Sequence, residues 1–110
     1  MRWRVTDETA DVLHLEPNNQ LLNTPNKITK SDWDNWDKER GLYFAERWDE
    51  TYTPILEISD KNESPLHGAL LTGKFGKGRH THTSLILHHQ VEKLVPGGFR
   101  ILANLLHKPV

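Results

Sequence analysis

The stretch that decides the fold covers residues 68–87 and reads GALLTGKFGKGRHTHTSLIL. Its first half is largely apolar, and its second half, residues 81–87, carries β-branched residues and ends in an apolar triplet. Between the halves, Gly76 and Gly78 permit the positive φ angles that hairpin turns require. We therefore predict an antiparallel β-hairpin over residues 68–87, with its turn at residues 75–79.

Three shorter strands are predicted on the N-terminal side of this hairpin. Residues 12–15, 42–44 and 54–58 are mostly apolar, and polar turn residues separate them. Residues 23–26 interrupt the chain as a loop, because the residue before Pro25 disfavours helical geometry and Asn favours turns.

Residues 31–40 carry the clearest helix signals of the chain. An N-terminal cap, an acidic first turn, a basic last turn and a following glycine are all present. Trp33 and Trp36 fall on one face of this helix of about three turns, so we expect both indoles to pack against a sheet. The residues that provide the start and end signals are Ser31, Asp32, Asp34, Lys38, Arg40 and Gly41.

A second helix is predicted at the C-terminal end. Pro96 suits a first helical turn, and the apolar residues after it recur at helical spacing. The predicted core-facing stripe consists of Phe99, Leu102, Ala103 and Leu106. Together these elements indicate an α+β fold: a mixed, largely antiparallel sheet that carries a short Trp-bearing helix and a C-terminal helix.

Length and composition limit the function classes. At 110 residues the chain has the size of one domain. The 14 Lys and Arg against 15 Asp and Glu leave no positive excess to hold a phosphate backbone, so we expect no nucleic-acid partner. The longest apolar run, residues 85–87, is too short to span a membrane, and residues 1–4 lead into polar sequence rather than the apolar stretch of a signal peptide. We expect neither a membrane partner nor an export signal. Because the sequence contains no cysteine, its composition fits both oxidising and reducing compartments.

Two of the seven histidines form a pattern. His80 and His82 lie two residues apart on a predicted strand, so both rings project from the same face, as in metal sites built on β-scaffolds. A metal would need a third ligand from His14, His67 or an acidic residue. We interpret His80 and His82 as packed imidazoles and keep metal binding as the alternative.

No catalytic residue is identified. Residues 32–37 superficially resemble a calcium loop, but Asp37 and Tyr43 occupy the positions that require Gly and Glu. Residues 76–78 lack the rest of a phosphate-binding loop, and no serine stands in a Gly-x-Ser-x-Gly elbow. We therefore expect no cofactor, and no hydrolase or amide-transfer activity of the chain by itself.

A ligand-binding edge is predicted around Trp48. Glu46, Asp49 and Glu50 flank this indole, and Tyr52 follows. An aromatic ring beside carboxylates can bind a carbohydrate, whereas acidic residues around one Trp are also typical of a solvated loop. The candidate ligand-binding residues are Trp48, Asp49 and Tyr52.

Six segments of the chain form one larger pattern. They are residues 4–10, 21–28, 41–44, 48–49, 68–71 with 76–78, and 96–106. The set covers nearly the whole chain and resembles the C-terminal end of bacterial LmbE-like (PIG-L type) deacetylase-family proteins. In those proteins this end is a class I glutamine amidotransferase-like region, similar to the ThuA-like proteins, in which a Gly-Lys-Gly turn and a final Arg-x-Leu-x-Asn-like helix recur.

The resemblance implies a non-catalytic accessory or interaction module with a glycan-related role, either as a single domain or as the last part of a larger amidotransferase-like domain. The zinc-dependent deacetylase motif of the family belongs to its N-terminal domain, and the amidotransferase nucleophile is a cysteine, so neither is carried over. The competing hypothesis is a small metal-binding or carbohydrate-binding domain that uses His80, His82 and Trp48.

The resemblance also implies an exposed strand edge, because a strand that is internal in the larger domain becomes a border here. We expect residues 81–87 to form this border and to pair with a second copy as a homodimer, or to dock on a neighbouring domain.

Overall fold

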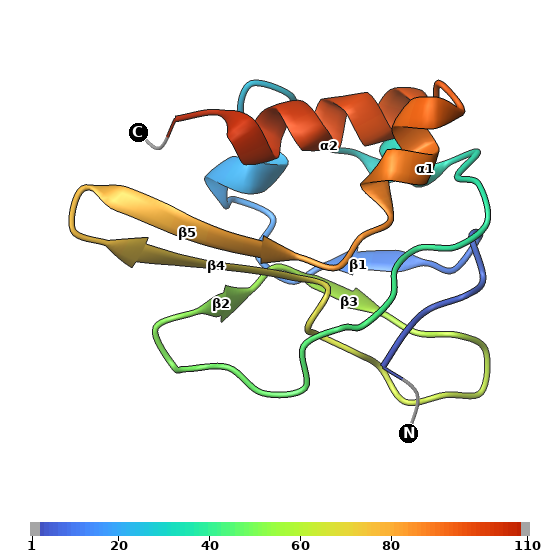
Figure 1. Ribbon diagram of the computed structural model, residues 1–110, viewed down its shortest axis with the longest axis horizontal. Helices are drawn as coiled ribbons and strands as arrows, with labels where there is room; N and C mark the ends of the chain where they lie inside the picture. Colours follow the sequence, from blue (N-terminus) through green and yellow to red (C-terminus); the bar gives the residue numbers. More distant parts are fainter. Residues whose placement is uncertain (1–2, 109–110) are drawn as a thin grey trace.

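Short antiparallel strands and two α-helices form the main regular structure of the described residues, so the predicted α+β fold is confirmed (Figure 1). The computed structural model describes residues 3–108; Met1 and Arg2, half of the basic N-terminus considered above, lie outside this range. The elements, with η for a 3-10 helix, are β1 (Val12–His14), η1 (Gln20–Leu22), η2 (Lys30–Trp33), β2 (Thr53–Pro54), β3 (Leu56–Ile58), β4 (Leu70–Phe75), β5 (Gly78–Thr83), α1 (Leu87–Glu92) and α2 (Pro96–Leu106).

The predicted hairpin is present as β4 and β5, each six residues long. Phe75 pairs with Gly78 across a two-residue turn, and Gly76 takes the positive φ of 59° that the turn needs. β2 pairs with the other side of β4, so this sheet has the order β2-β4-β5 with β5 at its border.

The second half of the hairpin is shorter than predicted. β5 ends at Thr83, Leu85 forms only an isolated bridge with Gly41, and Leu87 already begins α1. The apolar triplet is buried at the point where the chain leaves the hairpin and enters this helix. The short helix α1 was not expected from the sequence, which has no cap signal at that point.

The predicted strand over residues 54–58 is present but divided between two sheets. Ile55 N donates a hydrogen bond to Leu70 O at 3.0 Å, while Ile55 O accepts one from Leu15 N at 2.8 Å. The chain therefore leaves the hairpin sheet at Ile55 and continues as β3, which pairs with β1 as a separate two-stranded sheet. The β1 prediction is confirmed, whereas no strand forms at residues 42–44, where Tyr43 has a φ of 57°.

The predicted Trp-bearing helix is wrong in length. Only the single 3-10 turn η2 is helical, since Asp34 is already extended and Asn35 and Lys38 have φ values of 63° and 67°. Trp33 and Trp36 are nevertheless buried, and their ring centroids lie 5.2 Å apart. Both indoles belong to the hydrophobic core, but η2 and the loop after it carry them and not the predicted helix.

A buried cation explains why this segment is not a helix. The guanidinium of Arg40 donates to Ala10 O from Nε and Nη2, at 3.0 and 2.8 Å, and to Trp33 O from Nη1. It also lies 5.9 Å from the ring centroid of Trp33 and 5.4 Å from that of Trp36. Burial lowers the pKa of Arg40 to about 10. Both groups of the helical hydrogen bond from Asp37 N to Trp33 O are thus engaged by side chains, the carbonyl by Arg40 and the amide by Gln90 Oε1.

The C-terminal helix is confirmed as α2, but its buried face differs from the predicted stripe. Phe99 is exposed and Leu106 is 77% exposed, whereas the buried positions are Gly97, Gly98, Ile101 and Asn104. The two glycines allow α2 to pack on this face instead of the predicted one. A Cβ at Gly97 would stand 1.5 Å from Asp32 O, and one at Gly98 would stand 2.6 Å from Gln90 Cβ, so only glycine lets the backbones approach so closely.

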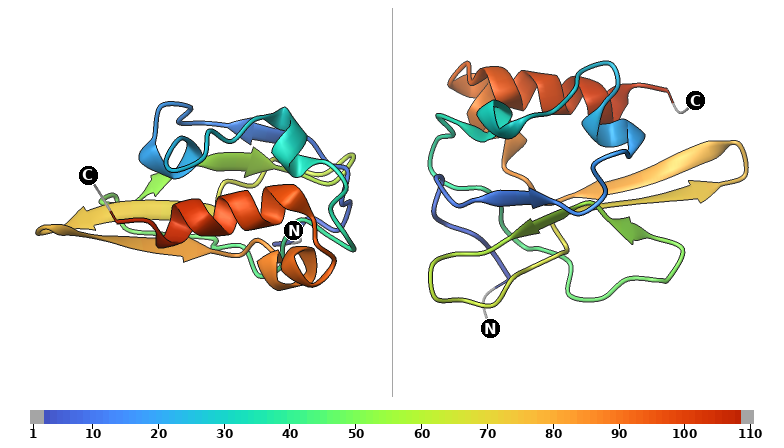
Figure 2. Two further views of the ribbon diagram at one scale, coloured as in Figure 1. Left: turned by 90° about the horizontal axis from the view of Figure 1, so that it is seen from above. Right: turned by 180° about the vertical axis from the view of Figure 1, so that it is seen from behind.

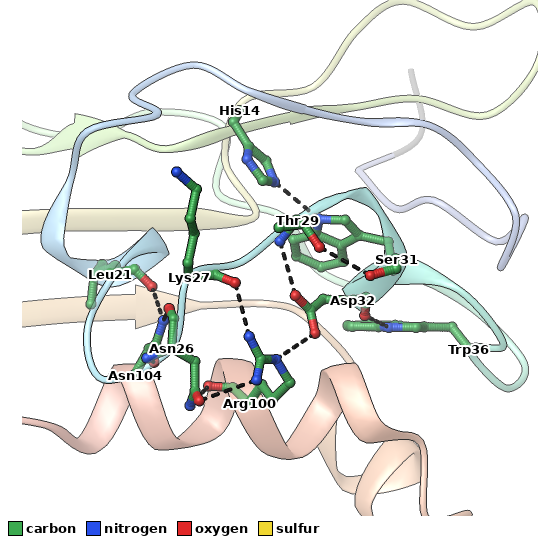
Figure 3. Close-up of polar contacts among 11 residues, drawn as sticks. His14, Leu21, Asn26, Lys27, Thr29, Ser31, Asp32, Trp36, Arg100 and Asn104 are labelled. Carbon is green, nitrogen blue, oxygen red and sulfur yellow. Dashed lines mark hydrogen bonds and ion pairs between the residues drawn. The ribbon is translucent and has the colours of Figure 1, made fainter.

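The helix α2 holds the N-terminal loops through buried side-chain hydrogen bonds (Figure 3). Asn104 is fully buried; its Nδ2 donates to Leu21 O at 2.8 Å and to Asn26 O at 2.7 Å, and its Oδ1 accepts from Asn26 N at 2.9 Å. One turn earlier, Arg100 Nε lies 2.7 Å from the buried carboxylate of Asp32. Figure 2 (left) shows the result, with η1 and η2 lying beside α2.

His14 joins β1 to the tryptophan pair. Trp33 Nε1 donates to His14 Nε2 at 3.0 Å, so this ring nitrogen must be unprotonated. Burial lowers the pKa of His14 below its ordinary value of 6.5, and the nearby carboxylate of Asp32 opposes this shift only in part.

We predict that Asn104→Ala lowers the free energy of unfolding by about 3 kcal/mol, because the carbonyls of Leu21 and Asn26 and the amide of Asn26 lose their partner. Urea unfolding followed by circular dichroism measures the loss. The matched control is Asn18→Ala on an exposed turn, where a change within about 0.5 kcal/mol is expected. A loss below about 1 kcal/mol for Asn104→Ala would contradict the role assigned to this amide.

We predict that protonation of His14 destabilises the fold. The unfolded chain binds this proton near pH 6.5 and the folded chain only at lower pH, so the stabilising contribution is complete above 6.5 and is lost as the pH falls through the folded value. Unfolding free energies between pH 7.5 and 5 should fall less steeply for His14→Gln than for the unaltered chain. The exposed His88→Gln serves as control and should keep the original slope; equal slopes for all three proteins would refute the prediction.

Candidate functional site

Three aromatic rings meet on one exposed face of the hairpin near its turn. The ring centroids of Tyr52 and Phe75 lie 5.8 Å apart, those of Tyr52 and His80 lie 5.7 Å apart, and those of Phe75 and His80 lie 6.4 Å apart. Tyr52 Oη and His80 Nδ1 also share a hydrogen bond of 2.8 Å. The rings support one another, yet Phe75 is 50% exposed and His80 is exposed as well.

The backbone of β4 makes room for this cluster at Gly73, which pairs with His80 across the hairpin. A Cβ at Gly73 would lie 3.0 Å from Thr51 O, 3.3 Å from the ring of Phe75 and 3.5 Å from the ring of Tyr52. A glycine at this position lets the Tyr52 ring lie across β4 and reach the histidine on the next strand.

Asp49 sets the direction of the chain that carries Tyr52. Its carboxylate accepts from Thr51 N at 2.9 Å, and its carbonyl accepts from Tyr52 N at 2.9 Å, which together make a tight turn. The hydrogen bonds from Thr51 lower the pKa of Asp49. Asp49 therefore acts on the aromatic cluster through the backbone.

The cluster borders a shallow hollow of about 480 Å³, here called the hairpin hollow, which is lined by Tyr52, Phe75, Gly78, Arg79 and His80. The C-terminal end of α2 holds the guanidinium of Arg79, whose Nη2 donates to His107 O at 2.8 Å and to Leu105 O at 3.5 Å. The C-terminal end of α2 is thereby tied to the hairpin next to the hollow.

The structure brings some of the predicted site residues together and leaves others apart. Tyr52 and His80, taken from two different hypotheses, contact each other. Trp48 is half-buried, and within the described residues it makes no ring contact with the cluster. His82 lies on the same exposed face as His80, and its Nε2 is 3.2 Å from Ser84 Oγ.

The third ligand that a metal would need is not within reach in a single copy. His14 is engaged with Trp33, and His67 Nε2 lies 2.8 Å from Glu57 Oε1. Across residues 3–108, no group of three His, Cys, Asp or Glu side chains is placed to hold a metal ion.

A second hollow, of about 470 Å³, lies over Arg40 between β1 and η2. Arg40 is its most distinctive group, but all three guanidinium nitrogens donate to backbone carbonyls, and the charged side chains that act on Arg40 from a distance are acidic. Arg40 therefore serves the fold, and the hairpin hollow is the better candidate site.

Phe75 and Gly73 are site residues that the sequence did not indicate. Phe75 was assigned to the turn, whereas the pairing register places it on the same face as Gly73 and His80. The alternation of β4 residues carried this signal, since positions two apart in a strand share a face. Tyr52 reaches the cluster from the segment just before β2, and no pattern near it in the sequence predicts its contacts with Phe75 and His80.

Comparisons with protein-family models, with curated proteins and with solved structures give no match for this chain. Among residues 3–108, no helix has both the length and the apolar character that crossing a membrane requires.

Proposed function

We propose that this chain is a non-catalytic binding module that takes a carbohydrate in the hairpin hollow. The observation that carries the proposal is the set of three mutually packed rings, Tyr52, Phe75 and His80, of which Tyr52 is half-buried and the other two are exposed. Rigid aromatic side chains held in this way provide contact area at a low cost in conformational entropy.

The chemistry of the hollow suits a sugar ring. A pyranose has an apolar face of C–H groups that can lie on the exposed ring of Phe75, and a rim of hydroxyls that both donate and accept hydrogen bonds. Tyr52 Oη and the Nε2 atom of His80 are polar groups at the edge of the hollow. An apolar surface with a few placed polar groups is the usual pattern of a small-molecule site.

The resemblance to the end of LmbE-like deacetylase-family proteins supports a glycan as the ligand class by association. In this proposal the chain binds and positions a glycan, and the chemical reaction on that glycan is carried out by another domain. The sequence contains no cysteine for an amidotransferase nucleophile, in keeping with a binding role.

We predict that short β-linked oligosaccharides of glucose or N-acetylglucosamine bind the chain weakly and shift the amide resonances of Phe75, Gly78 and His80 in two-dimensional NMR. Phe75→Ala should weaken binding at least tenfold, about 1.4 kcal/mol, because the exposed ring supplies the stacking surface.

The matched control for this titration is Tyr43→Ala, which removes an aromatic ring that is 88% exposed and lies outside the hollow. The control variant should bind like the unaltered chain. The proposal fails if no oligosaccharide shifts these resonances at millimolar concentration, or if Phe75→Ala and Tyr43→Ala have the same effect.

A further inference from the structure

The strand β5 has a free backbone edge. Ser84 N donates to Ala69 O, and in an antiparallel pair every second residue pair is hydrogen-bonded, so His82 and His80 direct their backbone groups toward β4. The backbone groups of Arg79, Thr81 and Thr83 therefore point away from the sheet. Within residues 3–108 these outward groups have no backbone partner, and Figure 1 shows β5 at the border of its sheet.

The exposed face of this edge carries two imidazoles with ring nitrogens available. His80 uses Nδ1 in its hydrogen bond with Tyr52, which comes from the β4 side, so its Nε2 faces away from Tyr52. The Nε2 atom of His82 lies 3.2 Å from Ser84 Oγ, and a metal ion would replace this contact, because Nδ1 is too close to the backbone to reach an ion shared with a second copy. At His80, the hydrogen bond at one ring nitrogen orients the other for a metal, as the outer partners of metal-binding histidines commonly do.

We propose that two copies of this chain pair antiparallel along β5 and that His80 and His82 of both copies bind one transition-metal ion of the zinc class. This site shares His80 with the hairpin hollow, but neither the metal nor the strand pairing depends on a bound carbohydrate. A single copy offers two ligands of the four that such an ion takes, and residues 3–108 contain no third one within reach. A second copy completes the set.

The register follows from the outward backbone groups. A two-fold axis at Thr81 lets this residue exchange both hydrogen bonds with its own counterpart, and it places His80 opposite the partner's His82. Opposed Cβ atoms in such a pair lie about 5 Å apart, and residues two apart along a strand about 7 Å. Four imidazoles around a rectangle of this size can meet one ion through Zn–N bonds of about 2.0 Å.

The charges along the edge permit this pairing. Arg79 comes opposite the partner's Thr83, so no two like charges face each other directly. The guanidinium of Arg79 is held on the other face of the sheet by Leu105 O and His107 O, away from the imidazoles. Because only about five residues per strand are paired, the metal supplies much of the attraction between the copies.

The test uses the full chain and zinc chloride. Analytical ultracentrifugation should show a monomer in EDTA and a doubled mass with zinc, and calorimetry should give one zinc per two chains. His82→Ala should abolish both the doubling and the uptake, whereas the exposed His88→Ala should retain both. Zinc bound one per monomer, a dimer that persists in EDTA, or no uptake at 100 μM zinc would each overturn the proposal, where about 100 μM is a weak affinity for a structural zinc site.

Two further variants separate the claims. Thr81→Pro removes an N–H that points outward, so it leaves the β4 ladder intact but should prevent the zinc-dependent doubling; doubling that survives this change refutes the strand pairing. Phe75→Ala removes the stacking ring of the hairpin hollow but keeps the hydrogen bond between Tyr52 and His80 that orients the imidazole, so the zinc-dependent doubling should persist. Failure of carbohydrate binding and failure of metal pairing are thus distinguishable.

Discussion

The buried amide of Asn104 is the contact on which the rest of the structure depends. Its three hydrogen bonds tie α2 to Leu21 and Asn26, in a part of the chain that has almost no regular structure. The strands are short and the loops are long, so backbone ladders alone leave many polar groups to be satisfied elsewhere. Side chains that reach loop carbonyls and amides take over this task, and the two glycines of α2 bring the helix close enough for them to do so.

The same principle recurs in other buried polar residues. Gln90 binds both the amide and the carbonyl of Asp37, Arg40 binds the carbonyls of Ala10 and Trp33, and Asp60 accepts hydrogen bonds from Thr6 and Asp7. Each buried polar atom that is satisfied stabilises a loop, and each would be costly if its partner were removed. The loops are therefore held firmly, and the hairpin with its aromatic rings extends from a rigid base.

The part of the fold that could be predicted is the part with local signals. Gly76 marked the hairpin turn, and Pro96 marked the start of the last helix, because both residues restrict or permit particular backbone angles. Of the candidate site, Tyr52 and His80 were named from the sequence, but their contact was not foreseen, since it joins residues 28 apart. Phe75 was not predicted as a site residue, because the glycines that follow it indicate a turn.

What the sequence by itself determined is the fold class, the hairpin, the last helix and the presence of two histidines on one face of a strand. These follow from periodicity and turn chemistry, which act over a few residues. Only the tertiary structure decided that the tryptophan segment is a loop around Arg40, that Asn104 rather than Phe99 faces the core, and that Tyr52 lies across Gly73. Each of these depends on partners distant in the chain, whose hydrogen bonds and close approach outweigh local helix and stripe preferences.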